Sequence, residues 1–370
     1  MRLPYTPAQE RFREEVRAWL LDEAPGVLPT DYDQRFQVLR DWQRRLYDAG
    51  WLGWGWAIDH GGRGGTVVEQ LIVYQEIARA RAPMPVGLVA LEVVGPTIAH
   101  FATPEQARRF LKPLLRGDEI WSQGFSEPDA GSDLASLSTR AELEDGGFVL
   151  TGHKVWTTQV QHARWCAVLA RTDPAAPRHE GISCLLVDLT SPGVTVRPLL
   201  QPTGDPEFGE VYFDAVRVPR ENLLGPLHEG WKVAMTTLAF ERAPAMLRRL
   251  AEIRTAFDGM LEEMRERLPA RELELVAERV GESAALLAAM EARGYRIVDR
   301  IQAGERTAED SIDKLFLTRV EQTVFGLAYE VLGASRLHEY LFGRAASIYG
   351  GTSEIQRNIL AERWLGLARA

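Results

Sequence analysis

A short polar stretch carries the first residues that could bind a ligand. GFSEPDAGSD, residues 124–133, follows the apolar segment EIWSQGF and combines small and turn-forming residues. In such a stretch, backbone N–H groups beside Ser126 and Ser132 could donate hydrogen bonds to a polar planar molecule. The same composition fits an ordinary surface turn equally well. Both interpretations stay open from composition alone.

An aromatic side chain beside a hydroxyl marks a second candidate. In KVWTT, residues 154–158, Trp156 and Thr158 fall on one face of an expected strand, because successive strand residues point to opposite faces. An indole plane next to a hydroxyl suits a planar heterocyclic ligand. A tryptophan of the hydrophobic core would produce the same pattern.

A glutamate on a mostly apolar helical stripe is the third candidate. The helix expected to begin near Gly230 places Val233, Thr237 and Glu241 on one stripe. Apolar and small neighbours one turn away would remove water from this carboxylate, raise its pKa and make it a usable base. A solvated surface glutamate is the competing interpretation.

A glycine pair precedes the last expected helix. The stretch IYGGTSEIQR contains Gly350 and Gly351. Ser353 and Gln356 have the spacing of a capping box, so the helix is expected to open at Thr352 to Ser353. A helix amino terminus suits a phosphate or pyrophosphate, because its N–H groups carry partial positive charge.

Several kinds of site are missing from the sequence. The seven histidines are scattered without the helical pair of a zinc site, and we expect no metal. There is no nucleophile elbow and no phosphate loop. The net charge of -9 gives no broad cationic surface for nucleic acid or an anionic membrane. Cys166 and Cys184 lie in apolar runs and are expected to be buried as small hydrophobes.

The composition is that of an ordinary globular protein. The 370 residues are 45% hydrophobic and 26% charged, and this length predicts two or three domains. The amino-terminal residues mix charges of both signs, and no apolar stretch reaches the ~18 residues of a membrane span. We therefore expect a cytoplasmic protein without a signal peptide or a membrane anchor.

A change of hydrophobic period along the chain predicts the elements that position these candidates. Apolar residues at three- and four-residue spacing predict helices at 7–24, 33–50, 66–82 and 93–102. Short β-branched and aromatic runs then predict strands at 148–158, 164–172, 182–189, 194–199 and 210–218. Helical spacing returns at 231–260, 272–304, 311–333 and 353–366.

This order predicts an α+β protein with three domains. No helical pattern separates the strands, so a compact antiparallel barrel or sandwich is favoured over a parallel sheet. Four helical segments after the strands suggest a bundle. We expect an N-terminal α-helical domain at 1–118, a central antiparallel β-barrel at 119–226 and a C-terminal four-helix bundle at 227–370.

Four stretches together resemble the acyl-CoA dehydrogenase family over nearly the whole chain. They are, in order, SEPDAGSD, GHKVWTT, GWKVAMTTLAFER and IYGGTSEIQR. Their order makes the resemblance far more specific than any one stretch would. It implies the three-domain fold given above, with FAD between barrel and bundle in a homo- or hetero-oligomer, a dimer or a tetramer.

The resemblance also assigns residues to the cofactor. Trp156 would flank the flavin ring, Thr158 would lie near its N5 edge, and Ser132 would also approach the CoA part of the substrate. The FAD-binding positions that the resemblance implies are Gln123, Phe125, Ser126, Gly131, Ser132, Trp156, Thr158, Thr352 and Glu354.

The catalytic base follows from a difference within the family. Many members carry a glutamate in the terminal loop, where this chain has Gly350, and glycine cannot accept a proton. A branch that includes isovaleryl- and long-chain-type enzymes instead carries its glutamate on the first bundle helix. Glu241 matches that position, and an arginine follows it, here Arg242. The resemblance therefore assigns the base to Glu241 and substrate positioning to Arg242.

The implied reaction converts an acyl-CoA thioester to a trans-2-enoyl-CoA. Glu241 would take the pro-R α-proton while the β-hydride passes to flavin N5. A flavin ribityl hydroxyl and the backbone N–H of Gly350 would stabilise the thioester oxygen as it gains charge. Electrons would then pass to an electron-transfer flavoprotein.

Two parts of the family pattern are missing. The arginine, phenylalanine–glycine pair and glutamine that reach a neighbouring subunit's FAD are absent from 270–294, and the glycine-rich turn near Gly333 is reduced. The chain in this respect resembles a bacterial branch that acts on bulky acyl groups such as sterol side chains, partly as two-gene heteromers. Two alternatives to the dehydrogenase are a non-catalytic partner subunit, and a flavin oxidase or carrier-protein thioester dehydrogenase of the same fold.

Overall fold

The computed structural model describes residues 5–303, 305 and 307–368, apart from the side chains of residues 240–244. Every helix in this part of the chain is too short or too polar to cross a lipid bilayer. The same part holds no group of three or more His, Cys, Asp or Glu side chains that could bind a metal ion.

The chain forms two compact units, which are described one at a time. The helical unit combines two N-terminal segments with the C-terminal part of the chain, Met1–Ala24, Thr66–Pro83 and Arg242–Ala370. The sheet unit contains all strands and the remaining helices, Pro25–Gly65 and Met84–Glu241. The first predicted helix and the third therefore pack with the C-terminal helices, whereas the second packs with the sheet.

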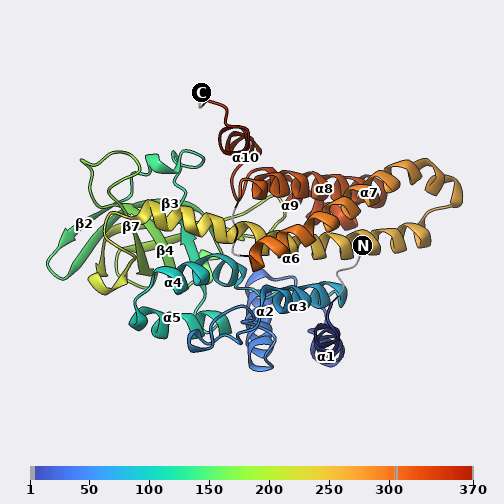
Figure 1. Cartoon of the computed structure of the whole chain (residues 1–370), viewed down its shortest axis with the longest axis horizontal. Coiled ribbons are helices and arrows are strands. Elements are labelled where there is room, and N and C mark those ends of the chain that lie inside the picture. The colour runs from blue at the N-terminus through green and yellow to red at the C-terminus, as the bar shows by residue number, and fades with distance from the viewer. Residues whose placement is uncertain (1–4, 304, 306, 369–370) are drawn as a thin grey trace. The chain divides into compact units, whose positions relative to one another are not determined.

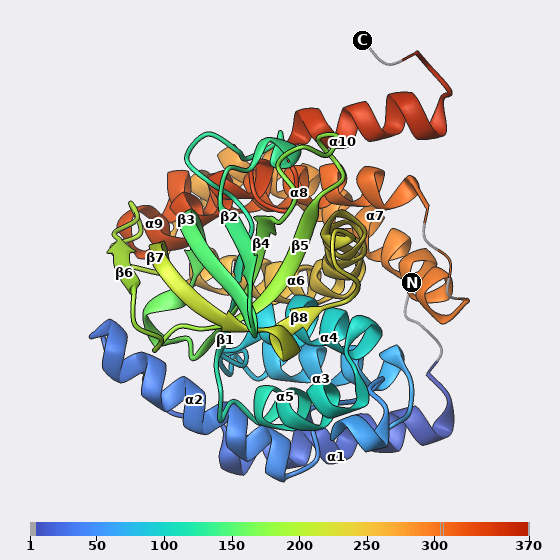
Figure 2. The same cartoon turned by 90° about the vertical axis from the view of Figure 1, so that its left-hand side faces the viewer.

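The sheet unit contains eight strands, and each of the five predicted strands is confirmed. In chain order, the strands are β1 (Trp121–Gly124), β2 (Arg140–Glu144), β3 (Gly147–Thr158), β4 (Trp165–Arg171), β5 (Ile182–Asp188), β6 (Val194–Leu199), β7 (Phe208–Pro219) and β8 (Leu223–Leu224). Their spatial order is β6-β7-β3-β2-β4-β5-β8, with β1 paired to β4 (Figure 2).

The expectation of a closed antiparallel barrel is wrong. Strands β6 and β8 are the two ends of the sheet, and no ladder joins them anywhere in the described sheet. β8 pairs with β5 through only two residues, which leaves too short an edge for closure. In addition, β4 pairs in parallel with both β1 and β2, whereas the other ladders are antiparallel.

The core of the sheet unit includes the two cysteines. β4 and β5 each bury six consecutive residues, which explains why they read as continuous apolar runs rather than as alternating ones. Cys166 and Cys184 are fully buried and free, as expected for small hydrophobes. Burial raises the pKa of both thiols, so neither is a reactive thiolate.

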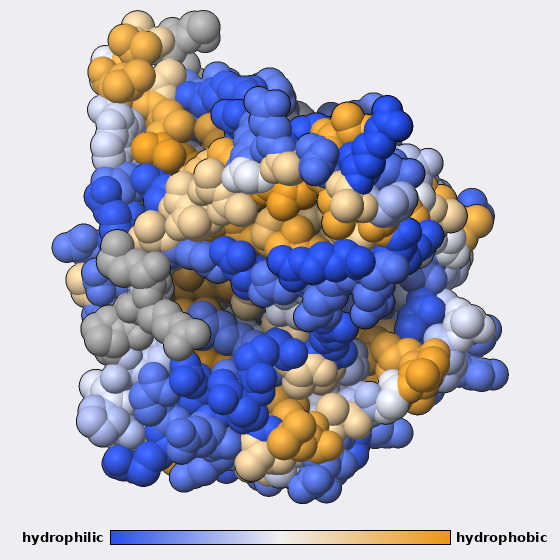
Figure 3. All heavy atoms as spheres, turned by 90° about the vertical axis from the view of Figure 1, so that its right-hand side faces the viewer, coloured by the Kyte–Doolittle hydropathy of each residue, from blue (hydrophilic) through white to orange (hydrophobic). Residues whose placement is uncertain are grey.

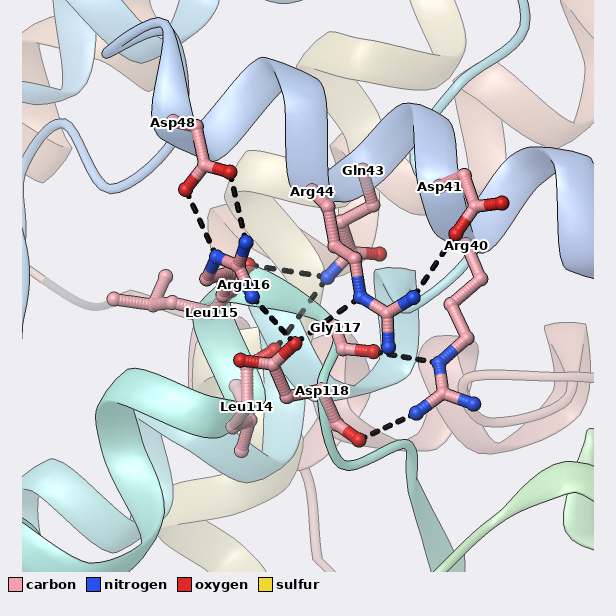
Figure 4. A network of polar contacts seen from close by, with 10 residues as sticks. All are labelled: Arg40, Asp41, Gln43, Arg44, Asp48, Leu114, Leu115, Arg116, Gly117 and Asp118. Carbon is pink, nitrogen blue, oxygen red and sulfur yellow. Dashed lines mark hydrogen bonds and ion pairs between the residues drawn. The ribbon is translucent and has the colours of Figure 1, made fainter.

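The helices of the sheet unit are α2 (Tyr32–Asp48), α4 (Gly95–Phe101), α5 (Pro104–Arg116) and the first part of α6 (Gly230–Arg267). α4 continues a π-helical turn, Ala90–Val94. Polar contacts connect α2 to the end of α5, where Arg116 forms a two-bond ion pair with Asp48 and Arg44 contacts Asp118 (Figure 4).

The helical unit is built from α1 (Pro7–Glu23), α3 (Val67–Arg79), the rest of α6, α7 (Ala270–Gln302), α8 (Glu309–Leu332), α9 (Leu337–Arg344) and α10 (Ser353–Ile359) (Figure 1). The four predicted C-terminal segments correspond to α6, α7, α8 and α10. Helix α9 was not predicted. Side chains of α3, α6, α7 and α8 share one hydrophobic core, which includes Ile72, Phe257, Leu287 and Val324.

Candidate active site

A buried ion pair fixes the polar stretch 124–133 to strand β3. The Lys154 ammonium donates to Glu127 Oε1 at 2.8 Å and to the Phe125 carbonyl at 3.0 Å. The side chains of Lys154 and Glu127 are 0% and 4% exposed. A buried pair of this kind is destabilising when one partner is removed, because the other charge is then left uncompensated. Residues 125–127 of the stretch are therefore a fixed part of the sheet unit.

The carboxylate of Glu127 also orders the chain that follows. It accepts hydrogen bonds from the backbone N–H groups of Ser138 and Thr139 at 2.7 and 2.9 Å. Burial by itself would raise the pKa of Glu127, but Lys154 and these hydrogen bonds outweigh it and lower the pKa to about 2. Burial lowers the pKa of Lys154, and Glu127 opposes that shift. Neither residue was predicted as part of the site, although a lysine in an apolar strand was a visible signal.

Trp156 occupies an unusual position on strand β3. Lys154 pairs with Val211 and Thr157 with Gly209, so two residues of β3 oppose one residue of β7 in a β-bulge. Trp156 lies in this bulge with φ +59° and is 62% exposed. A bulky side chain at positive φ is strained, and such strain is found mainly at functional sites. The bulge thus presents an indole to the outside of the sheet instead of burying it in the core.

Strand contacts bring the predicted residues of β1 and β3 together. Ser122 donates its hydroxyl to the Thr158 carbonyl at 2.7 Å, and the Val155 N–H donates to the Ser126 carbonyl at 3.0 Å. Gln123, Ser126 and Thr158 are half-buried, and Phe125 is buried. These hydrogen bonds join the segment that contains Gln123, Phe125 and Ser126 to the end of β3 that contains Trp156 and Thr158.

Gly131 and Ser132 lie further along, in an exposed turn. An added Cβ at Gly131 would meet nothing within 4 Å, so open space surrounds this backbone. Asp133, the next residue after Ser132, forms an ion pair with Arg178. This turn is thus accessible to a ligand and continuous with the buried segment that Glu127 holds.

The terminal glycines form a tight turn in the helical unit. Gly350 and Gly351 have φ values of 62° and 88°, in the left-handed region that favours glycine. The Gln356 amide, which is buried, donates to the Gly350 carbonyl at 2.9 Å. The predicted capping box of Ser353 and Gln356 is therefore wrong, because the Gln356 side chain bonds to the turn rather than to the helix cap.

Thr352 caps helix α10 instead. Its side chain accepts from the Ile355 N–H at 3.2 Å. Glu354 is exposed and lies 3.2 Å from Arg357. Thr352 and Glu354 thus both lie at the start of α10.

Glu241 and Arg242 lie on helix α6, and their side chains are outside the described residues. The two earlier members of the Glu241 stripe are described: Val233 is 0% exposed and Thr237 is 2% exposed. Thr97 of α4 donates to the Thr237 hydroxyl at 3.0 Å. Thr237, four residues before Glu241, is therefore buried and attached to α4 within the sheet unit.

Comparison with known proteins identifies the class to which this fold and these motifs belong. Three models of one family match the chain: acyl-CoA dehydrogenase, N-terminal domain, at residues 6–118; middle domain, at 122–216; and C-terminal domain, at 228–365. The chain belongs to the acyl-CoA dehydrogenase family. It is an FAD-dependent enzyme that acts on a CH–CH group.

The chain is similar to acyl-CoA dehydrogenase IpdE1 of Mycobacterium tuberculosis, with 40% identity over 97% of this chain and 98% of the relative. It is also similar to two solved structures. The first is named Tcur3481-Tcur3483 steroid ACAD, with 28% identity, a TM-score of 0.88 and full coverage of both chains. The second is the ChsE4-ChsE5 complex from Mycobacterium tuberculosis, with 30% identity, a TM-score of 0.83 and full coverage of both chains.

The described residues fit a flavin cofactor. A planar ring system needs a flat apolar surface, and the exposed, strained indole of Trp156 offers one. Half-buried polar side chains stand on strands β1 and β3 or directly after β1, namely Gln123, Thr158 and Ser126. This combination of a flat surface and nearby polar groups is what a flavin ring requires.

Proposed function

We propose that this enzyme removes the α-proton of an acyl-CoA thioester with Glu241 and forms a trans-2-enoyl-CoA. One observation carries the proposal. Helix α6 is continuous from Gly230 to Arg267 through Glu241, whereas the terminal turn has glycine at both 350 and 351, with left-handed backbone. The turn cannot supply a carboxylate, so the helix position is the remaining place for the base that the family resemblance implies.

We further propose which residues hold the cofactor. Gln123, Phe125 and Ser126 would border the flavin ring, with Trp156 against its plane and Thr158 near its N5 edge. Gly131 and Ser132 would lie in the adjoining turn, and Thr352 and Glu354 at the nucleotide end. Bound FAD supplies an acceptor for the β-hydride.

The remaining steps belong to groups of this chain. The Gly350 backbone N–H would donate a hydrogen bond to the thioester oxygen, which makes the α-proton more acidic. This donor does not depend on a side chain, so glycine preserves it. Arg242 would position the substrate beside Glu241, and Ser132 would contact its CoA part.

The substrate class and the partners are also proposals. Structurally similar proteins carry names that describe a steroid ACAD and a two-component complex. We infer that the acyl group is bulky and that the chain works in the cytoplasm as a homo- or hetero-oligomer, with an electron-transferring flavoprotein as acceptor. Exposed apolar side chains of Trp364, Leu365 and Leu367 near the C-terminal end support association with another chain. The face drawn in Figure 3 carries orange, hydrophobic side chains among the blue, hydrophilic ones.

Anaerobic mixing of the purified FAD-loaded protein with acyl-CoA thioesters tests the proposed reaction. Short, branched, long and steroid acyl-CoAs are compared by flavin absorbance, and the product is identified by its mass. We expect bleaching of the flavin with at least one thioester and formation of the enoyl-CoA. Bleaching that requires an added sister subunit would instead favour the non-catalytic partner subunit, and peroxide formation in air would favour an oxidase.

A further inference from the structure

A row of three hydrogen-bond donors on helix α8 faces the segment that leads to the Gly350 turn. Lys314, Thr318 and Gln322 are spaced by four residues, so their side chains lie on one face of α8. The row spans about 12 Å along the helix axis. Lys314 and Thr318 are each 8% exposed, and Gln322 is half-buried. We call these three residues the α8 donor row.

The α8 donor row binds backbone carbonyl groups at the end of α9 and in the turn that follows. Helices α8 and α9 pack side by side in the helical unit (Figure 1). Lys314 Nζ and Thr318 Oγ1 both donate to the Ala346 carbonyl, the latter at 3.1 Å. Gln322 Nε2 donates to the Gly343 carbonyl, also at 3.1 Å. The last carbonyls of a helix have no partner within that helix, and the donor row supplies one.

The hydroxyl of Thr318 shows that the row is directed at this segment. A threonine inside a helix can donate to the carbonyl four residues earlier, as Thr97 donates to Val93 at 2.8 Å. Thr318 instead donates to a different segment. Arg344 of α9 donates back to the Gln322 carbonyl at 3.2 Å, so hydrogen bonds run in both directions. Burying polar side chains is costly unless they form hydrogen bonds, so a row that served packing alone would be apolar.

Short backbone hydrogen bonds connect this segment to the Gly350 turn. The N–H groups of Ile348 and Tyr349 both donate to the Ala345 carbonyl, at 2.8 and 3.1 Å. Gln356 holds the other side of the turn through the Gly350 carbonyl. Within the described residues, no group accepts a hydrogen bond from the Gly350 N–H. The turn is therefore fixed on both sides, while its N–H is left for a ligand.

We propose that the α8 donor row sets the orientation of the Gly350 N–H and thereby its hydrogen bond to the thioester oxygen. Lys314, Thr318 and Gln322 are positioning residues, because each acts through the backbone and none needs to touch the substrate. A donor that stabilises developing charge depends steeply on its position, and a displacement of about 1 Å can slow a reaction roughly 10²-fold. This inference rests on the proposed function, because it takes Gly350 to be the donor to the thioester.

The kinetics of a donor-row variant test the inference. Thr318→Val combined with Gln322→Met removes two donors and nearly keeps the size of both side chains. The probes are octanoyl-CoA, isobutyryl-CoA and the steroid thioester cholyl-CoA, mixed anaerobically with the FAD-loaded protein. Stopped-flow absorbance over a range of thioester concentrations gives the limiting rate of flavin reduction and the dissociation constant. We expect the rate to fall roughly tenfold or more and the dissociation constant to change by less than about threefold.

The infrared band of the thioester carbonyl provides a readout that a loss of stability alone would not move. A hydrogen bond to a carbonyl oxygen lowers its stretching frequency. The same thioesters, isotope-labelled at this carbonyl, are bound to the FAD-loaded Glu241→Gln variant, so that no turnover occurs. We expect a band below that of the free thioester, and a return towards the free position when Thr318→Val and Gln322→Met are added.

Single substitutions on α8 assign the effect. Thr318→Ser keeps the hydroxyl and should retain nearly the original rate, whereas Thr318→Val alone should show part of the loss. Thr323→Val is the matched control on the same helix, since no hydrogen bond within the described residues joins the Thr323 side chain to residues 343–347. If the double variant does not fold, the comparison of Thr318→Val with Thr318→Ser still provides the test.

Three results would overturn the inference. They are a limiting rate of the double variant within about threefold of the original, an equal loss of rate in Thr323→Val, and a carbonyl band that the donor-row substitutions leave unchanged. Failure of the proposed function is a separate result, visible before any donor-row variant is compared. It would show as no flavin reduction by any probe, or as a bound carbonyl band at the free position, and the inference would then fall with it.

Discussion

At the scale of single residues, Trp156 shows a conflict between local backbone preference and function. Its positive φ is expected to cost about 1–3 kcal/mol, and a glycine there would avoid that cost. Retention of an exposed, strained tryptophan is understandable if its ring packs against a flavin. Because Trp156 is both strained and exposed, it is a stronger candidate for a flavin-binding residue than either property alone would make it.

We predict that Trp156→Gly keeps or raises the unfolding temperature of the FAD-free protein and weakens FAD binding roughly tenfold or more. The glycine relieves the backbone strain but removes the ring. Thermal unfolding of the FAD-free protein and fluorescence titration with FAD measure the two effects. Trp156→Phe keeps an aromatic ring, so its FAD affinity should lie between those of the original protein and Trp156→Gly. Unchanged FAD affinity in Trp156→Gly would remove Trp156 from the cofactor site.

The Lys154–Glu127 pair makes stability depend on pH. The folded protein lowers the pKa of Glu127 from 4.5 to about 2. The ionised carboxylate therefore stabilises the folded state at pH values above 4.5. That contribution is lost as the pH falls from 4.5 towards 2. Lys154→Met should lower the free energy of unfolding at neutral pH by about 3–5 kcal/mol, because it leaves a buried carboxylate without its partner.

The difference in the free energy of unfolding between the original protein and Lys154→Met separates the effect of this pair from that of other carboxylates. It should be largest at neutral pH and should narrow as the pH falls towards 2, the pKa of Glu127 beside Lys154, as measured by urea unfolding across the pH range. Lys232→Met is the control, since Lys232 is 70% exposed and its ion pair with Glu229 should contribute little. If the difference in the free energy of unfolding stays constant with pH, the pKa of Glu127 does not depend on Lys154.

At the scale of elements, the terminal turn depends on backbone conformation. Gly351 has φ +88°, and an added Cβ would lie 2.6 Å from Gln356 Nε2, the group that holds the turn. Gly351→Ala should therefore lower the free energy of unfolding by about 1–2 kcal/mol or more. It should also slow flavin reduction, because the shifted turn carries the Gly350 N–H.

A second glycine provides the matched control. Gly281 lies inside α7 with nothing within 4 Å of an added Cβ, so Gly281→Ala should be stabilising by about 0.4–1 kcal/mol. Urea unfolding compares the two variants, and stopped-flow absorbance gives the reduction rate. Equal effects of the two substitutions would mean that the terminal turn has no special conformational requirement.

Elements with strong local signals were predictable from the sequence. The helix predicted at 7–24 is α1, which begins with Pro7 at its first position after a capping box at Thr6. Helix α5 was missed although Thr103, Pro104 and Gln106 form a complete capping box. Pro113 lies inside this helix, and an interior proline is a local signal against a helix. A helix was thus predicted where its local signals agreed with one another.

Long-range features could not be predicted in the same way. The parallel pairing of β1 with β4 joins Trp121 to Trp165 across 44 residues, and no local pattern encodes it. The bulge at Trp156 breaks the regular alternation of the strand, so alternation alone could not place its side chain. The ion pair of Lys154 with Glu127 is equally non-local. For the candidate site, the grouping of the motifs stays a prediction, and the structure shows how the segments in the sheet unit are held.

At the scale of the whole molecule, the order of helices, strands and helices was predicted correctly, whereas the predicted barrel was wrong because the sheet is open. Closure depends on whether the end strands can pair, and β8 offers only Leu223 and Leu224. The grouping of α1 and α3 with the C-terminal helices is also a tertiary property, because it depends on contacts between segments far apart in the sequence.

The exposed C-terminal side chains lead to a prediction about association. Leu365 and Leu367 are 65% and 57% exposed, and we expect the purified protein to form dimers or larger oligomers through this region. The double substitution Leu365→Ser with Leu367→Ser should weaken association by about tenfold or more, as measured by analytical ultracentrifugation. Leu21→Ser is the control, because Leu21 is 79% exposed on α1, away from that region of the chain. Equal oligomer stability in both variants would exclude the C-terminal contact.

The rate of flavin reduction in the Glu241→Gln variant is the most direct test of the central claim. FAD-loaded original and variant proteins, matched for FAD content, are mixed anaerobically with the thioester that the original protein oxidises fastest. The amide keeps the shape of the side chain and cannot accept a proton, so we predict normal FAD binding and a rate lower by about 10²–10⁴-fold. A variant that reduces its flavin within about tenfold of the original rate would show that another group removes the α-proton.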